Sequence, residues 1–167
     1  MKDVRPTTSI VIEAIFNILG PLSNVAFLDL FAGTGRVALE AWSRGARPVV
    51  AVELLRRRCE AVKRAGVKPE EGLVLLFMDV RRAIRWLDKR GYSFNVIFAD
   101  PPYDSSWAIE TLELLTSKRG LVRPGGVIML ERSSREIVNG IPKCLQLVDE
   151  RRYGDTVLST FRFAEGD

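Results

Sequence analysis

The chain has 167 residues, of which 47% are apolar and 28% are charged, and its formal net charge is +4 at pH 7. This length predicts a single domain over residues 1–167, able to bury roughly 70% of its extended-chain surface. There is no histidine and there are only two cysteines, which excludes Ser-His and Cys-His nucleophiles and argues against a metal site or a disulfide framework.

The sequence also bears on location and partners. Residues 1–9 lack the apolar segment of a signal peptide, and no stretch approaches ~18 uncharged apolar residues. We therefore expect a cytoplasmic protein without membrane contact. The basic excess permits a nucleic-acid partner, although a soluble protein that happens to be basic fits the charge equally well.

Apolar periodicity divides the chain into alternating helices and strands. Residues 8–19 have one apolar helical face, so residues 1–20 are predicted to form an N-terminal segment and helix ahead of a sheet core over 25–167. Such alternation predicts an α/β fold with a doubly wound, mostly parallel sheet. Strands are predicted at 25–30, 49–52, 73–77, 94–99 and 127–130, helices at 36–44, 54–65, 79–90 and 106–116, and a final antiparallel pair at 145–150 and 156–163.

Two arginine runs, at residues 56–58 and 81–82, fall within predicted helices. A run of like charges on a helix usually lies on its solvated face, and that is the interpretation we favour. The alternative is an edge that contacts phosphate groups.

Four acids mark the ends of successive predicted strands. Asp29 lies inside the first strand, and Glu53, Asp79 and Asp100 follow the next three. In a doubly wound sheet, ligands bind beyond the carboxyl ends of the strands. We therefore expect the four carboxylates to line one ligand site.

The segment DLFAGTG, residues 29–35, is the first candidate binding loop. Gly33 and Gly35 allow a tight turn and close approach to a ligand. Residues 33–38 also fit the G-x-G-x-x-A dinucleotide pattern, with Glu53 18 residues beyond Gly35, so an NAD-dependent dehydrogenase is an alternative. Asp29 argues against the dehydrogenase, since a carboxylate at that position can hold an ammonium group. Glu53 can accept hydrogen bonds from the hydroxyls of a ribose, and Asp79 can accept one from the amino group of an adenine.

The segment FADPPY, residues 98–103, is the second candidate. A residue before proline is held extended, and proline has no N–H, so this turn offers the Asp100 carboxylate and the Pro101 carbonyl as acceptors and almost no donors. Such a corner suits an exocyclic amine, whose nitrogen attacks an electrophilic methyl group while Asp100 stabilises the developing positive charge. Tyr103 offers a ring on which a flipped base can stack. A plain strand-ending turn, with Ser105 or Ser106 capping the next helix, is the alternative.

DLFAGTG together with DPPY resembles class I S-adenosylmethionine-dependent methyltransferases that act on amines. The flanking segments resemble, more narrowly, the bacterial 16S rRNA guanine-N2 methyltransferase family of the RsmD type. That resemblance covers most of the chain. It is carried by RPTTSIVIEAIFNIL (5–19), FLDLFAGTGRVALEAWSRGA (27–46), VVAVE (49–53), FNVIFADPPY (94–103), GGVIMLE (125–131) and RRYGDT (151–156).

The resemblance implies a seven-stranded sheet with a reversed last strand, S-adenosylmethionine as methyl donor, and 16S rRNA or the small ribosomal subunit as partner of a monomeric enzyme. Family members carry a β-hairpin arm before the segment that begins at Arg5, and with four residues there we expect it to be absent. The implied site consists of the donor-binding residues Asp29, Phe31, Ala32, Gly33, Thr34, Gly35, Glu53, Leu54, Asp79 and Val80, the catalytic residues Asp100, Pro101, Pro102 and Tyr103, and the substrate-binding residues Arg5, Thr7 and Tyr103.

Three further interpretations stay open. Related amine pockets serve DNA adenine or a protein glutamine, so the acceptor is not fixed by the DPPY segment. A dehydrogenase remains possible on the glycine pattern, but no histidine, lysine or tyrosine is obviously placed for hydride transfer. A catalytically silent RNA-binding module is the third, and the intact DPPY segment argues against it.

Overall fold

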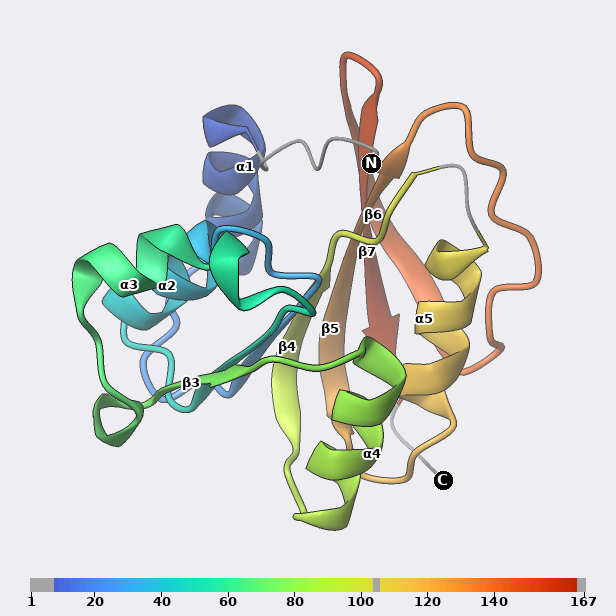
Figure 1. The fold of residues 1–167 in the computed structure, drawn as a ribbon. Coiled ribbons are helices and arrows are strands. Elements are labelled where there is room, and N and C mark those ends of the chain that lie inside the picture. Colours follow the sequence, from blue (N-terminus) through green and yellow to red (C-terminus); the bar gives the residue numbers. More distant parts are fainter. Residues whose placement is uncertain (1–7, 104–105, 165–167) are drawn as a thin grey trace.

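The computed structural model describes residues 8–103 and 106–164 (Figure 1). Seven strands form one sheet in the order β3-β2-β1-β4-β5-β7-β6. β1 to β5 are parallel to one another, whereas β7 runs antiparallel to both β5 and β6, so the expected reversed last strand is confirmed. The strands are β1 (Phe27–Leu30), β2 (Val49–Val52), β3 (Leu73–Leu76), β4 (Phe94–Ala99), β5 (Val122–Ser133), β6 (Leu145–Tyr153) and β7 (Thr156–Phe163).

Helices cover both faces of the sheet, as Figure 1 shows: α1, α2 and α3 lie on one side, and α4 and α5 on the other. Alternate residues of a strand point to opposite faces, so Phe27 packs in the core under the first set and Leu28 in the core under the second. Both faces are therefore buried, as the predicted apolar strands require. The helices are α1 (Ser9–Leu19), α2 (Arg36–Ser43), α3 (Glu60–Ala65), α4 (Val80–Lys89) and α5 (Trp107–Thr116), with 3₁₀ turns at η1 (Arg56–Arg58) and η2 (Pro69–Glu71).

Most helix boundaries agree with the sequence prediction to within one residue. The Thr8 hydroxyl accepts from the Val11 amide at 3.4 Å, and Asp79 accepts from the Arg81 amide at 2.8 Å, so both side chains cap a helix start. Ser106 occupies the cap position of α5, but its side chain makes no capping bond. Ser105 lies outside the described residues.

The continuous helix predicted over residues 54–65 is wrong. Glu53 Oε2 accepts a hydrogen bond from the Leu55 amide at 2.6 Å, and Leu55 has extended backbone angles of φ −108° and ψ 110°. The chain is thereby held extended just beyond β2, and it turns through η1 before α3 begins. Cys59 is buried, and the arginines of η1 are partly or fully exposed, as expected for a solvated run of charges.

Two strands are longer than predicted. β5 already begins at Val122, which pairs with Phe94 of β4, and β5 and β6 both gain further pairs with β7 at their ends. β5 continues past the predicted end at residue 130 to Ser133, which pairs with Thr156. β6 continues past residue 150 to Tyr153, which also pairs with Thr156. These ends consist mostly of polar residues, so the apolar runs used to predict the strands do not include them. Across the described ranges, no helix has the length and apolar character that spanning a bilayer requires.

The start of β1 depends on one side chain of β4. Asn95 Oδ1 accepts from the Ala26 amide at 2.9 Å, while the Asn95 and Val96 amides donate to the Ala26 carbonyl at 3.0 and 3.2 Å. Ala26 is buried, so its amide has no access to water.

Asn95→Ala is expected to lower the free energy of unfolding by about 1–3 kcal/mol, because the buried Ala26 amide loses its acceptor. Urea denaturation measures this directly. Asn17→Ala, on the exposed side of α1, serves as the control and should change the value by less than about 0.5 kcal/mol. Equal effects of the two substitutions would contradict the role of Asn95 as the acceptor for the Ala26 amide.

Candidate active site

The ends of three neighbouring strands stand at one level. Leu30 of β1 is in register with Val52 of β2 and with Ala99 of β4. The residues that follow these three, Phe31, Glu53 and Asp100, therefore emerge side by side. Asp79 follows β3, the next strand along the edge, and Asp29 lies inside β1. The expectation that the four acids gather at one edge of the sheet is confirmed.

Asp29 is an almost completely buried acid, with 1% of its surface exposed. Its Oδ2 accepts from the Ala38 amide of α2 at 3.1 Å, whereas Oδ1 has no hydrogen-bond partner among the described residues. Burial raises the pKa of Asp29 from 3.8 to about 8; the Ala38 hydrogen bond lowers it and the charge of Glu53 raises it further. A buried acceptor without a donor is a place where a ligand's donor group fits.

The glycine loop is bent at three positions with left-handed backbone, namely Phe31 (φ 60°), Gly33 (φ 57°) and Gly35 (φ 86°). A Cβ on Gly35 would lie 2.5 Å from Val62 Cγ2 of α3, so packing against α3 requires glycine there. A Cβ on Gly33 would meet nothing within 4 Å, so that side of the loop is open. Left-handed backbone at Phe31 is strained for a residue with a side chain, a feature that concentrates at functional sites.

The same loop is tied to its neighbours by main-chain hydrogen bonds. The Ala32 amide donates to the Val52 carbonyl at 2.9 Å, and the Thr34 carbonyl accepts from the Ala61 amide at 3.1 Å. The loop therefore has a fixed position between β2 and α3.

Beyond β2, the Glu53 side chain makes a hydrogen bond and an ion pair, whereas the side chain of the next residue, Leu54, is exposed to solvent. Glu53 is 5% exposed, and the Leu55 amide and the Arg58 guanidinium, 3.8 Å away, both contact its Oε2. A carboxylate has about four lone-pair sites, so Glu53 keeps capacity for further donors. Leu54 is 61% exposed, which is unusual for a leucine.

Asp79 has a structural contact as well as an exposed oxygen. Its Oδ1 caps α4, and its Oδ2 lies 3.9 Å from an Arg81 nitrogen. Val80 packs in the core at 5% exposure, so its side chain presents little surface to a ligand.

The proline corner, Asp100–Tyr103, follows directly after β4. The Asp100 amide already donates to the Leu30 carbonyl at 3.3 Å, Pro101 is buried and Pro102 is exposed. The Tyr103 hydroxyl lies 3.5 Å from Thr156 Oγ1 at the start of β7. Burial raises the pKa of Tyr103 above its ordinary value, with the charges of Glu131, Asp100 and Glu136 adding to the rise and the Thr156 contact opposing it.

A cluster around Trp107 was missed by the sequence reasoning. The Trp107 ring meets the Phe31 ring edge-on, with centroids 5.3 Å apart, and the Arg81 guanidinium carbon lies 4.1 Å from the Trp107 ring centre. Arg81 also contacts Glu110 at 2.6 Å. The cluster ties the start of α5, which follows the proline corner, to the glycine loop. Arg81 is therefore not a purely solvated residue of its run, and no spacing rule connects it with Trp107.

Glu131 was also missed, although a signal for it existed. It is 4% exposed and lies one residue beyond the strand predicted at 127–130. The strand-end pattern that identified the other acids applies equally to this fifth strand. Arg5 and Thr7, both predicted to contact substrate, lie outside the described residues. Within 8–103 and 106–164, no group of three or more metal-ligating side chains is present.

The sheet order and its glycine loop define the class of protein. An RNA methyltransferase from Salinibacter ruber, solved in complex with S-adenosyl-L-homocysteine, has the same fold at a TM-score of 0.71, with 15% identity over 98% of this chain and 96% of that one. The Escherichia coli protein yhhF superimposes with a TM-score of 0.82 at 26% identity, covering 99% of this chain and 91% of that one. The fold is that of the class I S-adenosylmethionine-dependent methyltransferases.

The family follows from sequence similarity. A family model described as "Conserved hypothetical protein 95" matches residues 1–162. Ribosomal RNA small subunit methyltransferase D of Escherichia coli K12 is 31% identical over 140 residues, which is 83% of this chain and 68% of that protein. The enzyme of the same name from Buchnera aphidicola (strain Bp) is 30% identical over 137 residues, 80% of this chain and 67% of that protein. The chain belongs to this family, the RsmD-type methyltransferases, as the resemblance indicated.

Asp29 makes stability depend on pH. In the unfolded chain the carboxyl ionises near pH 3.8, whereas in the native protein it stays protonated up to about pH 8. Between these values the native state binds the extra proton, so the free energy of unfolding should fall as pH rises. Thermal unfolding of the ligand-free protein between about pH 5 and 8 should therefore show a flatter pH dependence for Asp29→Asn than for the wild type. Glu13→Gln on exposed α1 should keep the wild-type slope, and an unaltered slope in Asp29→Asn would contradict the assignment.

Proposed function

We propose that this protein transfers a methyl group from S-adenosylmethionine to the exocyclic N2 of a guanine in 16S rRNA. The observation that carries the proposal is the proline corner, Asp100–Tyr103, which stands in register beside the glycine loop after β1. A corner that accepts hydrogen bonds and a loop suited to a charged cofactor are thus adjacent. Relatives named as small-subunit rRNA methyltransferases support rRNA as the acceptor.

The residues present fit the donor. Asp29 Oδ1 is a buried acceptor without a partner in the described structure, and the ammonium of the methionine part would supply that donor while favouring the ionised carboxylate. Glu53 would accept from the ribose hydroxyls. Leu54 would cover a face of the adenine, which accounts for its exposure here, and Asp79 would accept from the adenine amine. The glycine loop, residues 31–35, would follow the methionine and ribose.

The acceptor amine would be held by oxygen atoms alone. The Asp100 carboxylate and the Pro101 carbonyl each accept one N–H, and this directs the nitrogen lone pair away from the corner. When bound, the donor supplies an electrophilic methyl group on a sulfonium. The amine nitrogen would attack that methyl group, the methyl–sulfur bond would break with its electrons passing to sulfur, and the extra proton on nitrogen would leave to water. Asp100 stabilises the positive charge that develops on nitrogen, so no histidine is needed.

Tyr103 would support the ring of the flipped base. Its hydroxyl contacts Thr156, so the ring has a fixed position on β7. The exposed cations Arg135, Arg151 and Arg152 lie beyond β5 and on β6 near the same edge, and they suit the phosphate groups of RNA.

The acceptor can be identified by incubating the purified protein with labelled donor and either naked 16S rRNA or small subunits. Nucleoside mass spectrometry followed by mapping would give the base and the atom. N2-methylguanine is expected. Methyladenine would instead favour an adenine amine as the acceptor, since two acceptor oxygens hold any exocyclic amine.

Asp100→Ala should lower turnover by about 10²-fold or more, because one preorganised charge partner is lost. The dissociation constant of S-adenosylhomocysteine, measured by calorimetry, should stay unchanged. Asp88→Ala at the far end of α4 is the control. Undiminished turnover in Asp100→Ala would refute the catalytic role.

Glu53→Ala should weaken donor binding by about 1.5–3 kcal/mol, the range for a hydrogen bond to a charged group. Calorimetry with S-adenosylhomocysteine measures the change, and Glu60→Ala on the exposed side of α3 provides the comparison. An equal dissociation constant in Glu53→Ala and wild type would remove Glu53 from the donor site.

A further inference from the structure

We infer that a slot beside the proline corner binds an unpaired nucleobase that neighbours the methylated guanine in the rRNA. This inference rests on the proposed function and extends it to a second RNA contact. The slot lies between the first turns of α5 and the segment 136–139, which follows β5, and has a volume of about 400 Å³.

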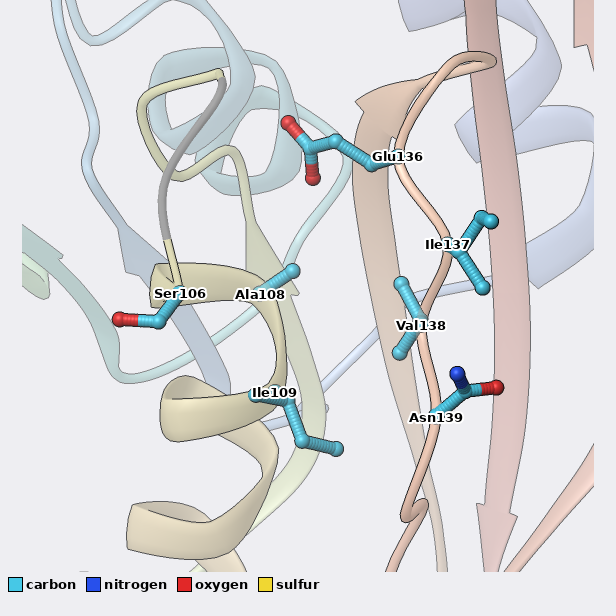
Figure 2. Close-up of a pocket in the computed structure, with 7 residues that line it drawn as sticks. All are labelled: Ser106, Ala108, Ile109, Glu136, Ile137, Val138 and Asn139. Atoms are coloured by element: carbon cyan, nitrogen blue, oxygen red, sulfur yellow. The ribbon is translucent and has the colours of Figure 1, made fainter.

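Two apolar walls face each other across the slot. Figure 2 shows Ala108 and Ile109 of α5 directed toward Val138 on the opposite segment. The Glu136 carboxylate extends over one end, while the Ile137 side chain points away from α5. This alternation is that of an extended chain, in which successive side chains take opposite sides.

The slot is separate from the donor site. Successive helical residues are rotated by about 100°, so Trp107 and Ile109 lie on opposite sides of α5. Trp107 contacts Phe31 of the glycine loop. Ile109 therefore faces away from the donor loops, and α5 stands between the two sites.

The slot is instead adjacent to the amine corner. Ser106, which borders it, is three residues from Tyr103, and the charge of Glu136 is among those that act on the Tyr103 hydroxyl. A nucleotide chain with one base at the corner would therefore pass the slot with a neighbouring base. Arg135 precedes Glu136 and is exposed, where it suits the phosphate of that nucleotide.

The chemistry of the slot fits a base better than a sugar or a phosphate. Facing apolar walls accommodate the flat faces of an aromatic ring, and a carboxylate at the end accepts from the N–H groups on its edge. An anionic phosphate is disfavoured beside Glu136. The preferred base carries an exocyclic amine, as in the recognition of cytosine N4 by an acidic side chain.

The test compares residues that line the slot with an exposed residue that does not. Val138→Ala and the isosteric Glu136→Gln should each raise the KM for 16S rRNA by about 10-fold, because the first loses two methyl groups and the second a charge-assisted hydrogen bond. Gln146→Ala, at the exposed start of β6 and outside the lining of the slot, should leave that KM unchanged. The kcat at saturating RNA and the dissociation constant of S-adenosylhomocysteine should match wild type in all three variants.

Equal KM values in wild type, Val138→Ala and Glu136→Gln would overturn the inference, as would equal losses in Val138→Ala and Gln146→Ala. If the wild type methylates no rRNA, the proposed function fails and the slot is tested by binding alone. A single-stranded oligoribonucleotide containing 2-aminopurine should then change fluorescence on adding wild-type protein and Gln146→Ala but not Val138→Ala. No fluorescence change with the wild type would overturn the inference that the slot binds a base.

Discussion

The register of β1 with its two neighbours is the constraint on which the site depends. Leu30 pairs with Val52 on one side and Ala99 on the other, and this brings Phe31, Glu53 and Asp100 to the same level. A slip of one residue would turn every side chain of β1 to the other face. Asp29 would then lie in the core beneath α4 and α5, away from the Ala38 amide that it now contacts. Packing on both faces of the sheet thus fixes the positions of the acids.

The same packing places an acid where water does not reach. Burial favours the neutral form of Asp29, and the nearby Glu53 adds to this preference. A fold selected for stability alone would have little use for that carboxyl, because one of its oxygens has no donor in the described residues. A cationic ligand group would reverse the preference, so the proposed donor site would account for this acid.

The sequence predicted those parts of the molecule whose structure is determined by residues close together in the chain. Continuous apolar strands, helix caps such as Thr8 and Asp79, and the two prolines after Asp100 each act through neighbouring residues. The extended turn after Glu53, the Trp107 cluster and the polar ends of β5 and β6 arise from contacts between distant segments. Arg81 shows the difference best: within its run it looks solvated, but it lies against a ring 26 positions away. Only the fold brings the two together.

α5 links these observations, because its two sides meet different partners. One side carries Trp107, which packs on Phe31 in the strained part of the glycine loop. The other side carries Ala108 and Ile109, which line the slot opposite Val138. Since α5 follows directly from the proline corner, this one helix connects the glycine loop, the corner and the slot.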